Sequence, residues 1–177
     1  ALQAIETRPG FQLQLAAAEP LVRDPIAMAF DENSRLFVVE FPEYNHKHAG
    51  WKIPRQGVIR MLVDTNEDGR FDRSTVYVDK LDSPTSVACY DGGIIVAAAP
   101  DLIYCKDTDG DGRADVRKKI FSGFAISAER GGGARLNSIR WGLDHRFHLC
   151  TSFSGGQVVR LGEKDAQPLD VRNRGFE

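Results

Sequence analysis

The stretch that decides the fold is Asp64–Asp72, DTNEDGRFD, which recurs 43 residues later as Asp107–Asp115, DTDGDGRAD. Each copy has oxygen-bearing side chains at positions 1, 3, 5 and 9 and a glycine at position 6. Oxygen ligands spaced by two along a tightly turning backbone converge on one point, and glycine permits the sharp bend. Both copies therefore predict calcium-binding loops, with Arg70 and Arg113 contributing only a backbone carbonyl at position 7. The predicted ligand residues are Asp64, Asn66, Asp68, Arg70, Asp72, Asp107, Asp109, Asp111, Arg113 and Asp115.

The alternative for each copy is an acidic hairpin turn, since Asp-Gly favours tight turns without any metal. Three carboxylates and an amide in the first copy, and four carboxylates in the second, favour the metal, because the carboxylates repel one another unless a cation lies between them. Position 12 is Thr75 or Lys118, so the bidentate glutamate of an EF-hand is missing. We therefore expect structural rather than sensor sites. The second should bind more tightly, because it has Asp109 where the first has Asn66.

The spacing of 43 residues lies in the range of propeller blades and helical arrays. Short apolar runs flank each acidic stretch: Val58–Val63 and Leu102–Cys105 lead into it, and Ser74–Val78 and Arg117–Phe121 follow it. Two further runs separated by a polar turn precede each of these pairs. Four short strands per unit predict an all-β chain of four-stranded antiparallel β-propeller blades.

A third unit begins at Asn137–Gly142 but has Gly162–Asp165 in place of the acidic loop. We expect one propeller segment over residues 1–177, with blades at 25–82, 83–124 and 136–172 and a leading strand at 11–15. Three blades do not close, because propellers have about four to eight and an open ring leaves unpaired edges. The sequence thus predicts that other chains or further domains complete or cover the ring.

Composition excludes several functional classes. The chain has 177 residues with 42% hydrophobic and 27% charged residues, a net charge of −2 and a pI of about 6.1, which argues against nucleic acid as a partner. No apolar run approaches the roughly 20 residues of a membrane span. Calcium loops and a start at alanine favour a mature periplasmic or extracellular protein, with a shortened chain as the alternative.

The three cysteines, Cys89, Cys105 and Cys150, occur singly within apolar stretches. We expect buried free thiols, with a Cys89–Cys105 bridge left open as an alternative. No C-x-x-C-H motif for haem attachment is present.

Two connections, Glu40–Gly57 and Ser122–Leu136, are too long for hairpin turns and are expected to carry binding functions. His46 and His48 in the first are expected to be solvated, with a shared transition metal as the alternative. Trp141 is expected in the core, and Arg140 could face the propeller axis.

The segments Arg8–Phe11, Ala18–Val22, Ala99–Leu102, Asp107–Asp115 and Asn137–Asp144 together carry a family resemblance. They resemble the N-terminal propeller region of the membrane-bound dehydrogenase family of planctomycetes and related bacteria, over nearly the whole chain. That family is similar, more distantly, to the soluble glucose and sorbosone dehydrogenases, six-bladed propellers that use pyrroloquinoline quinone. The resemblance implies a quinone near Asn137 and Arg140 and a carbohydrate or other small-molecule ligand.

Those dehydrogenases place a catalytic histidine a few residues before the strand that here begins at Ile139, whereas Gly131–Arg140 contains no histidine. Because removing hydride from a sugar carbon needs a general base, no catalytic residue is identified. We therefore expect an extracytoplasmic calcium-binding propeller segment used for binding and assembly. The alternative is a quinone-dependent sugar or alcohol dehydrogenase.

Overall fold

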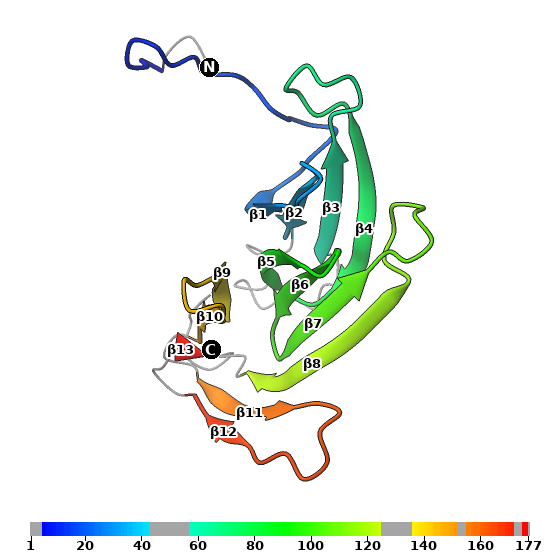
Figure 1. Ribbon diagram of the computed structural model, residues 1–177, viewed down its shortest axis with the longest axis vertical. Helices are drawn as coiled ribbons and strands as arrows, with labels where there is room; N and C mark the ends of the chain where they lie inside the picture. Colours follow the sequence, from blue (N-terminus) through cyan, green and yellow to red (C-terminus); the bar gives the residue numbers. More distant parts are fainter. Residues whose placement is uncertain (1–4, 43–56, 125–135, 152–154, 172–174, 177) are drawn as a thin grey trace.

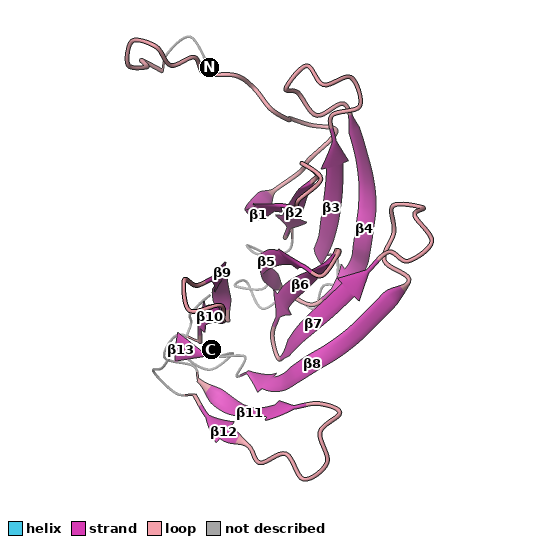
Figure 2. Cartoon of the chain, viewed as in Figure 1, coloured by secondary structure: helices cyan, strands magenta, loops and turns pink. Residues whose placement is uncertain are grey.

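The computed structural model describes residues 5–42, 57–124, 136–151, 155–171 and 175–176 (Figure 1). These residues form strands, turns and loops and contain no helix (Figure 2). Consistent with this, the described part of the chain has no helix that could cross a membrane. The all-β fold class predicted from the sequence is confirmed.

The first sheet contains β1 (Pro25–Phe30), β2 (Leu36–Glu40), β3 (Gly57–Val63) and β4 (Arg73–Leu81), hydrogen-bonded in that order. All neighbouring strands are antiparallel. The turn between β1 and β2 is held by Asp31, whose carboxylate accepts hydrogen bonds from the backbone N–H groups of Asn33 and Arg35. The sheet coincides with the first predicted unit.

The second sheet repeats this order with β5 (Pro84–Tyr90), β6 (Gly93–Ala98), β7 (Asp101–Lys106) and β8 (Val116–Phe124). Every residue of β6 is buried, which explains why its sequence is continuously apolar rather than alternating. This sheet coincides with the second predicted unit.

The two sheets pack face to face, and their facing side chains form the largest hydrophobic cluster. The first sheet contributes Phe37, Ile59, Met61 and Tyr77, and the second contributes Val87, Ile94, Val96 and Ile103. β5 contacts both β1 and β9 (Asn137–Trp141), so the first strands of the three units are neighbours. Figure 1 shows these strands along one side of the molecule and β4 and β8 along the other.

The third unit differs from the prediction, because its strands do not form one four-stranded sheet. β10 (Phe147–Cys150) pairs with β9 and β13 (Gly175–Phe176). β11 (Gly156–Arg160) pairs instead with β8 and with β12 (Leu169–Asp170), which extends the second sheet to six strands. The blade predicted at 136–172 is therefore wrong as a single sheet.

Gly123 in β8 gives the physical reason for this pairing. It has φ +104°, and a Cβ there would overlap the carbonyl oxygen of Gln157 in β11. Glycine thus allows β11 to approach, and β11 satisfies the hydrogen-bonding groups along the outer edge of β8.

The leading strand predicted at 11–15 is also wrong, since these residues pair with no strand among the described residues. Figure 1 shows the N-terminal segment running away from the sheets. An alternating sequence is not sufficient for a strand, because its backbone groups need a neighbouring strand to pair with.

All three cysteines are free: Cys105 is buried, Cys89 is half-buried and Cys150 is exposed. The expected burial is therefore wrong for Cys150. Burial raises the pKa of Cys105 to about 11 and, together with the Asp31 and Glu32 carboxylates, that of Cys89 to about 12.

Candidate metal centre

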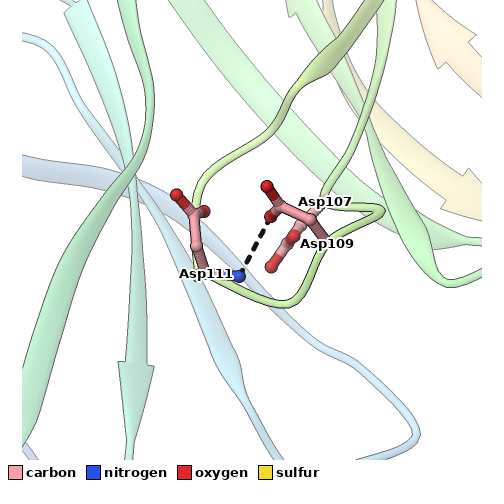
Figure 3. A group of neighbouring side chains, drawn as sticks. All are labelled: Asp107, Asp109 and Asp111. Carbon is pink, nitrogen blue, oxygen red and sulfur yellow. Dashed lines mark hydrogen bonds between the residues drawn. The ribbon is translucent and has the colours of Figure 1, made fainter.

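Three carboxylates of the second acidic loop lie together where the loop joins β7 to β8. Asp107, Asp109 and Asp111 each offer an oxygen, and these oxygens lie within 4.8 Å of one another. Figure 3 shows the three side chains with the Asp111 N–H donating to Asp109. In the described part of the chain, no other three acidic, histidine or cysteine side chains gather as closely.

Backbone hydrogen bonds fix the orientation of these carboxylates. Asp107 accepts from the N–H groups of Gly110 at 2.7 Å and Gly112 at 2.8 Å. Both glycines have positive φ, +81° and +85°, so the loop turns tightly enough for their N–H groups to point inward. Asp111 in turn accepts from the N–H of Arg113 at 2.7 Å.

These hydrogen bonds keep Asp107 ionised. Burial raises the pKa of its carboxyl, but the hydrogen bonds from the N–H groups of Gly112 and Gly110, together with those from Asp109, lower it, and the net pKa is below its usual value of 3.8. Ionised oxygens held close together repel one another unless a cation lies between them. Calcium prefers oxygen donors of this kind, so the residues present fit a calcium ion.

Asp115, a predicted ligand at position 9, is not part of this group. Its carboxylate accepts hydrogen bonds from the backbone N–H of Thr108 at 2.7 Å and from the Thr108 hydroxyl. These bonds lower its pKa and close the loop. Asp72 in the first loop accepts the same pair of bonds from Thr65, at 3.2 and 2.7 Å. The threonine at position 2 of both copies indicates that the aspartate at position 9 closes the loop, and the expected ligand pattern did not take it into account.

The first loop has the same backbone shape but a different set of contacts. Asp64 accepts from Gly69 N–H at 2.8 Å, and Asp68 accepts from Arg70 N–H at 2.8 Å, as the corresponding residues do in the second loop. Here, however, the Asn66 amide donates to Asp68 at 3.3 Å. That bond offsets part of the negative charge, so the first loop has less need of a cation.

The second loop is anchored to the first sheet through Tyr77 in β4. The N–H of Asp107 donates to the Tyr77 hydroxyl oxygen at 2.9 Å, and the N–H of Ala114 donates to the Tyr77 carbonyl at 2.9 Å. Tyr77 is buried, and burial raises its pKa to about 12. Arg117, just after the loop, donates to the carbonyl of Asp79 at 2.9 Å. The acidic loop is therefore a joint between the two sheets.

The residues predicted to contact a quinone, Asn137 and Arg140, are both exposed on β9. The Asn137 side chain accepts from the N–H of Ser138 at 2.7 Å, and Arg140 donates to the carbonyl of Ile139 at 3.2 Å. These short-range contacts do not form an enclosed site for a flat cofactor. No chemical step is derived through a quinone, and its binding stays a prediction.

Trp141 is 53% exposed, which corrects its expected place in the core. It lies at the end of β9, where its ring stacks on Tyr90 at 6.2 Å and meets the edge of Phe147 at 4.8 Å. His46 and His48 lie outside the described residues, as do most of the long connections, residues 43–56 and 125–135.

Fold and site together define an all-β protein of repeated antiparallel sheets with an acidic loop between its outer strands. The chain belongs to the family described as a domain of unknown function, DUF7133, whose model matches residues 1–176. Comparison with curated proteins and with solved structures gave no match.

Proposed function

We propose that this chain is an extracytoplasmic, calcium-binding β-propeller segment that acts in binding and assembly. The observation that carries the calcium part is the group of Asp107, Asp109 and Asp111, whose oxygens lie within 4.8 Å of one another. Backbone N–H groups fix the orientation of Asp107 and Asp111 within this group, and such preorganised ligands lower the cost of binding a cation.

The blade arrangement is supported by the repetition of one four-strand order in the first two sheets. These sheets pack face to face, and their first strands, β1 and β5, are neighbours. Propeller blades stack in this way around a central axis. The third unit departs from the pattern, since β11 extends the second sheet.

The proposed role of calcium is to stabilise the joint between the sheets. Asp107 supplies a carboxylate to the acidic group and an N–H to Tyr77 of the neighbouring sheet. Binding a cation at this loop would therefore hold β7, β8 and β4 in one arrangement. The first loop is proposed as a second, weaker calcium site, because Asn66 replaces a carboxylate.

An extracytoplasmic location is part of the proposal. The loops lack the bidentate glutamate of high-affinity EF-hands, and Asp109 and Asp111 are exposed to solvent. Extracellular calcium sites have dissociation constants of about 10⁻⁴–10⁻³ M, so sites of this kind fill where calcium is abundant.

Thermal unfolding in calcium chloride and in EGTA tests this proposal. Ligands that bind only the folded state stabilise it by mass action, so EGTA should lower the melting temperature by several degrees. The double variant Asp109→Asn, Asp111→Asn should lose most of that difference. Glu163→Gln, in the loop that replaces the acidic stretch in the third unit, is the matched control and should keep it. An equal shift in the double variant and the control would contradict the proposed site.

A further inference from the structure

The two acidic loops contact different segments through the same loop position. The eighth residue of the second loop, Ala114, donates its N–H to the carbonyl of Tyr77 at 2.9 Å. The eighth residue of the first loop, Phe71, donates its N–H to the carbonyl of Ala16 at 3.0 Å. Ala16 of the N-terminal segment therefore corresponds to Tyr77 of β4.

A second contact gives the same correspondence. The sixth residue of each loop is a glycine. Each glycine lies beside the residue two positions before the carbonyl that its loop contacts: Thr75 before Tyr77, and Gln14 before Ala16. A Cβ on Gly112 would lie 3.6 Å from Thr75, and a Cβ on Gly69 would lie 3.5 Å from Gln14. Gln14 thus contacts the first loop with its side chain and Ala16 with its carbonyl, as Thr75 and Tyr77 contact the second loop, and the spacing of two is that of an extended strand.

Residues 11–16, here called the arm, thus lie beside the first loop where β4 lies beside the second loop, but they are not part of a sheet. In the first sheet, β4 pairs with β3 along its other edge, with Ser74 opposite Leu62 and Thr75 opposite Met61. Among the described residues, no strand pairs with the arm. Since backbone groups alternate between the two edges of a strand, those of Leu13 and Leu15 lie on the free edge.

The face of the first sheet beside the arm is open along β1, whereas on β2 and β3 it is covered by the chain itself: Leu36, Val38 and Leu62 are buried against Ala17, Leu21, Val22 and Phe71. Met28 pairs with Val38 in the first sheet, as Val87 pairs with Val96 in the second. Val87 is 1% exposed because the first sheet covers it, whereas Met28 is 62% exposed and Phe30 is 59% exposed. An apolar cavity of about 400 Å³ lies between this face and the end of the arm, lined by Ala16, Ala17, Val22, Met28, Val38 and Leu62.

We propose that the arm and the open face of the first sheet bind another antiparallel β-sheet of the same repeat, whose edge strand pairs with the arm as β3 pairs with β4. Strand addition satisfies an unpaired backbone edge, and a flat apolar face is covered by a second sheet. The packing between the two sheets of this chain defines the partner surface: small residues on its first strand, like Ala27 and Ala29, and large ones on its second, like Phe37 and Val39.

A second copy stacked head to tail would have to offer this surface with its third unit, and it does not. The cross-strand pair on the β9–β10 hairpin that corresponds to Ala29 and Phe37 is Arg140 and His148, which are polar and accessible to solvent. The partner is therefore a different sheet of the repeat. This inference rests on the assembly part of the proposed function and is independent of whether the loops bind calcium.

A peptide with the sequence of β3, Gly57–Val63, with lysines added at both ends, serves as the probe for the full chain. Hydrogen exchange followed by mass spectrometry should show slower exchange in residues 11–16 when the peptide is added. Leu13→Pro removes an N–H from the free edge and should abolish the slower exchange. Met28→Asp should weaken the affinity for the peptide at least tenfold. Leu143→Asp, at a fully exposed residue far from the arm in the β9–β10 turn, should bind as the unaltered chain does.

Absence of added protection in the arm, or equal protection in the Leu13→Pro variant, would overturn the inference. Protection of the arm without peptide that is lost on dilution would also overturn it, because it would identify a second copy as the occupant. Parallel measurements in calcium and in EGTA separate this result from the proposed function. Peptide protection that persists without any calcium effect would sink only the calcium site.

Discussion

The hydroxyl oxygen of Tyr77 lies 2.9 Å from the backbone nitrogen of Asp107 and accepts its hydrogen bond. Tyr77 belongs to the outer strand of the first sheet, and Asp107 is the first residue of the second acidic loop. One side chain of one unit is therefore bonded to the proposed calcium loop of the next. The stability of the loop and the packing of the sheets should depend on each other.

Tyr77→Phe should lower the free energy of unfolding by about 1–2 kcal/mol, because the Asp107 N–H loses its acceptor in a partly buried place. Urea denaturation measures this loss. Tyr104→Phe is the matched control, since its hydroxyl bonds to the Asp91 carbonyl at an exposed site and should cost less than about 1 kcal/mol. Equal losses in the two variants would mean that the Tyr77 bond does not hold the joint together.

Gly123→Ala should detach β11 from β8. A methyl group there would overlap the Gln157 carbonyl oxygen, in addition to the strain of a positive φ. Gly162→Ala carries only the strain, about 1–2 kcal/mol, because no atom lies within 4 Å of its Cβ position. We expect a larger loss of stability for Gly123→Ala and faster hydrogen exchange in β11. If β11 exchanges at the same rate in both variants, the pairing with β8 is wrong.

The first two sheets and the acidic loops could be predicted from the sequence, because alternation and a repeated ligand pattern are local signals. The attachment of β11 to β8 could not, since strand partners depend on which edge is free after the sheets have packed. Gly123 was the one local signal of that contact, but a single glycine in a strand does not indicate which strand packs against it. The arm was predicted as a strand because apolar and polar residues alternate over Phe11–Leu15. Among the described residues it has no neighbouring strand to pair with, although its correspondence to β4 implies one.

Acid should weaken the second loop through Asp107. The folded-state pKa of this carboxyl lies below its usual 3.8, so the carboxylate stabilises the fold above that pH. The stabilisation is lost as the pH falls through the folded-state pKa, since protonation removes the negative charge that strengthens the hydrogen bonds from Gly110 and Gly112. After calcium has been removed with EGTA at neutral pH and dialysed away, stability measured from pH 5 down to pH 2 should fall less steeply in Asp107→Asn than in Glu163→Gln. Identical profiles would exclude Asp107 as a source of the pH dependence.

The most direct test of the account is calorimetric titration of calcium into the metal-free chain. We predict saturable binding with a tighter and a weaker site, and the tighter one should disappear in the double variant Asp109→Asn, Asp111→Asn while the weaker one remains. Magnesium at the same concentration should compete poorly, because it demands a near-octahedral site and gives up its water reluctantly. A titration without saturable heat in the unaltered chain, or a tighter site that survives in the double variant, would contradict the proposal that Asp107, Asp109 and Asp111 form a calcium centre.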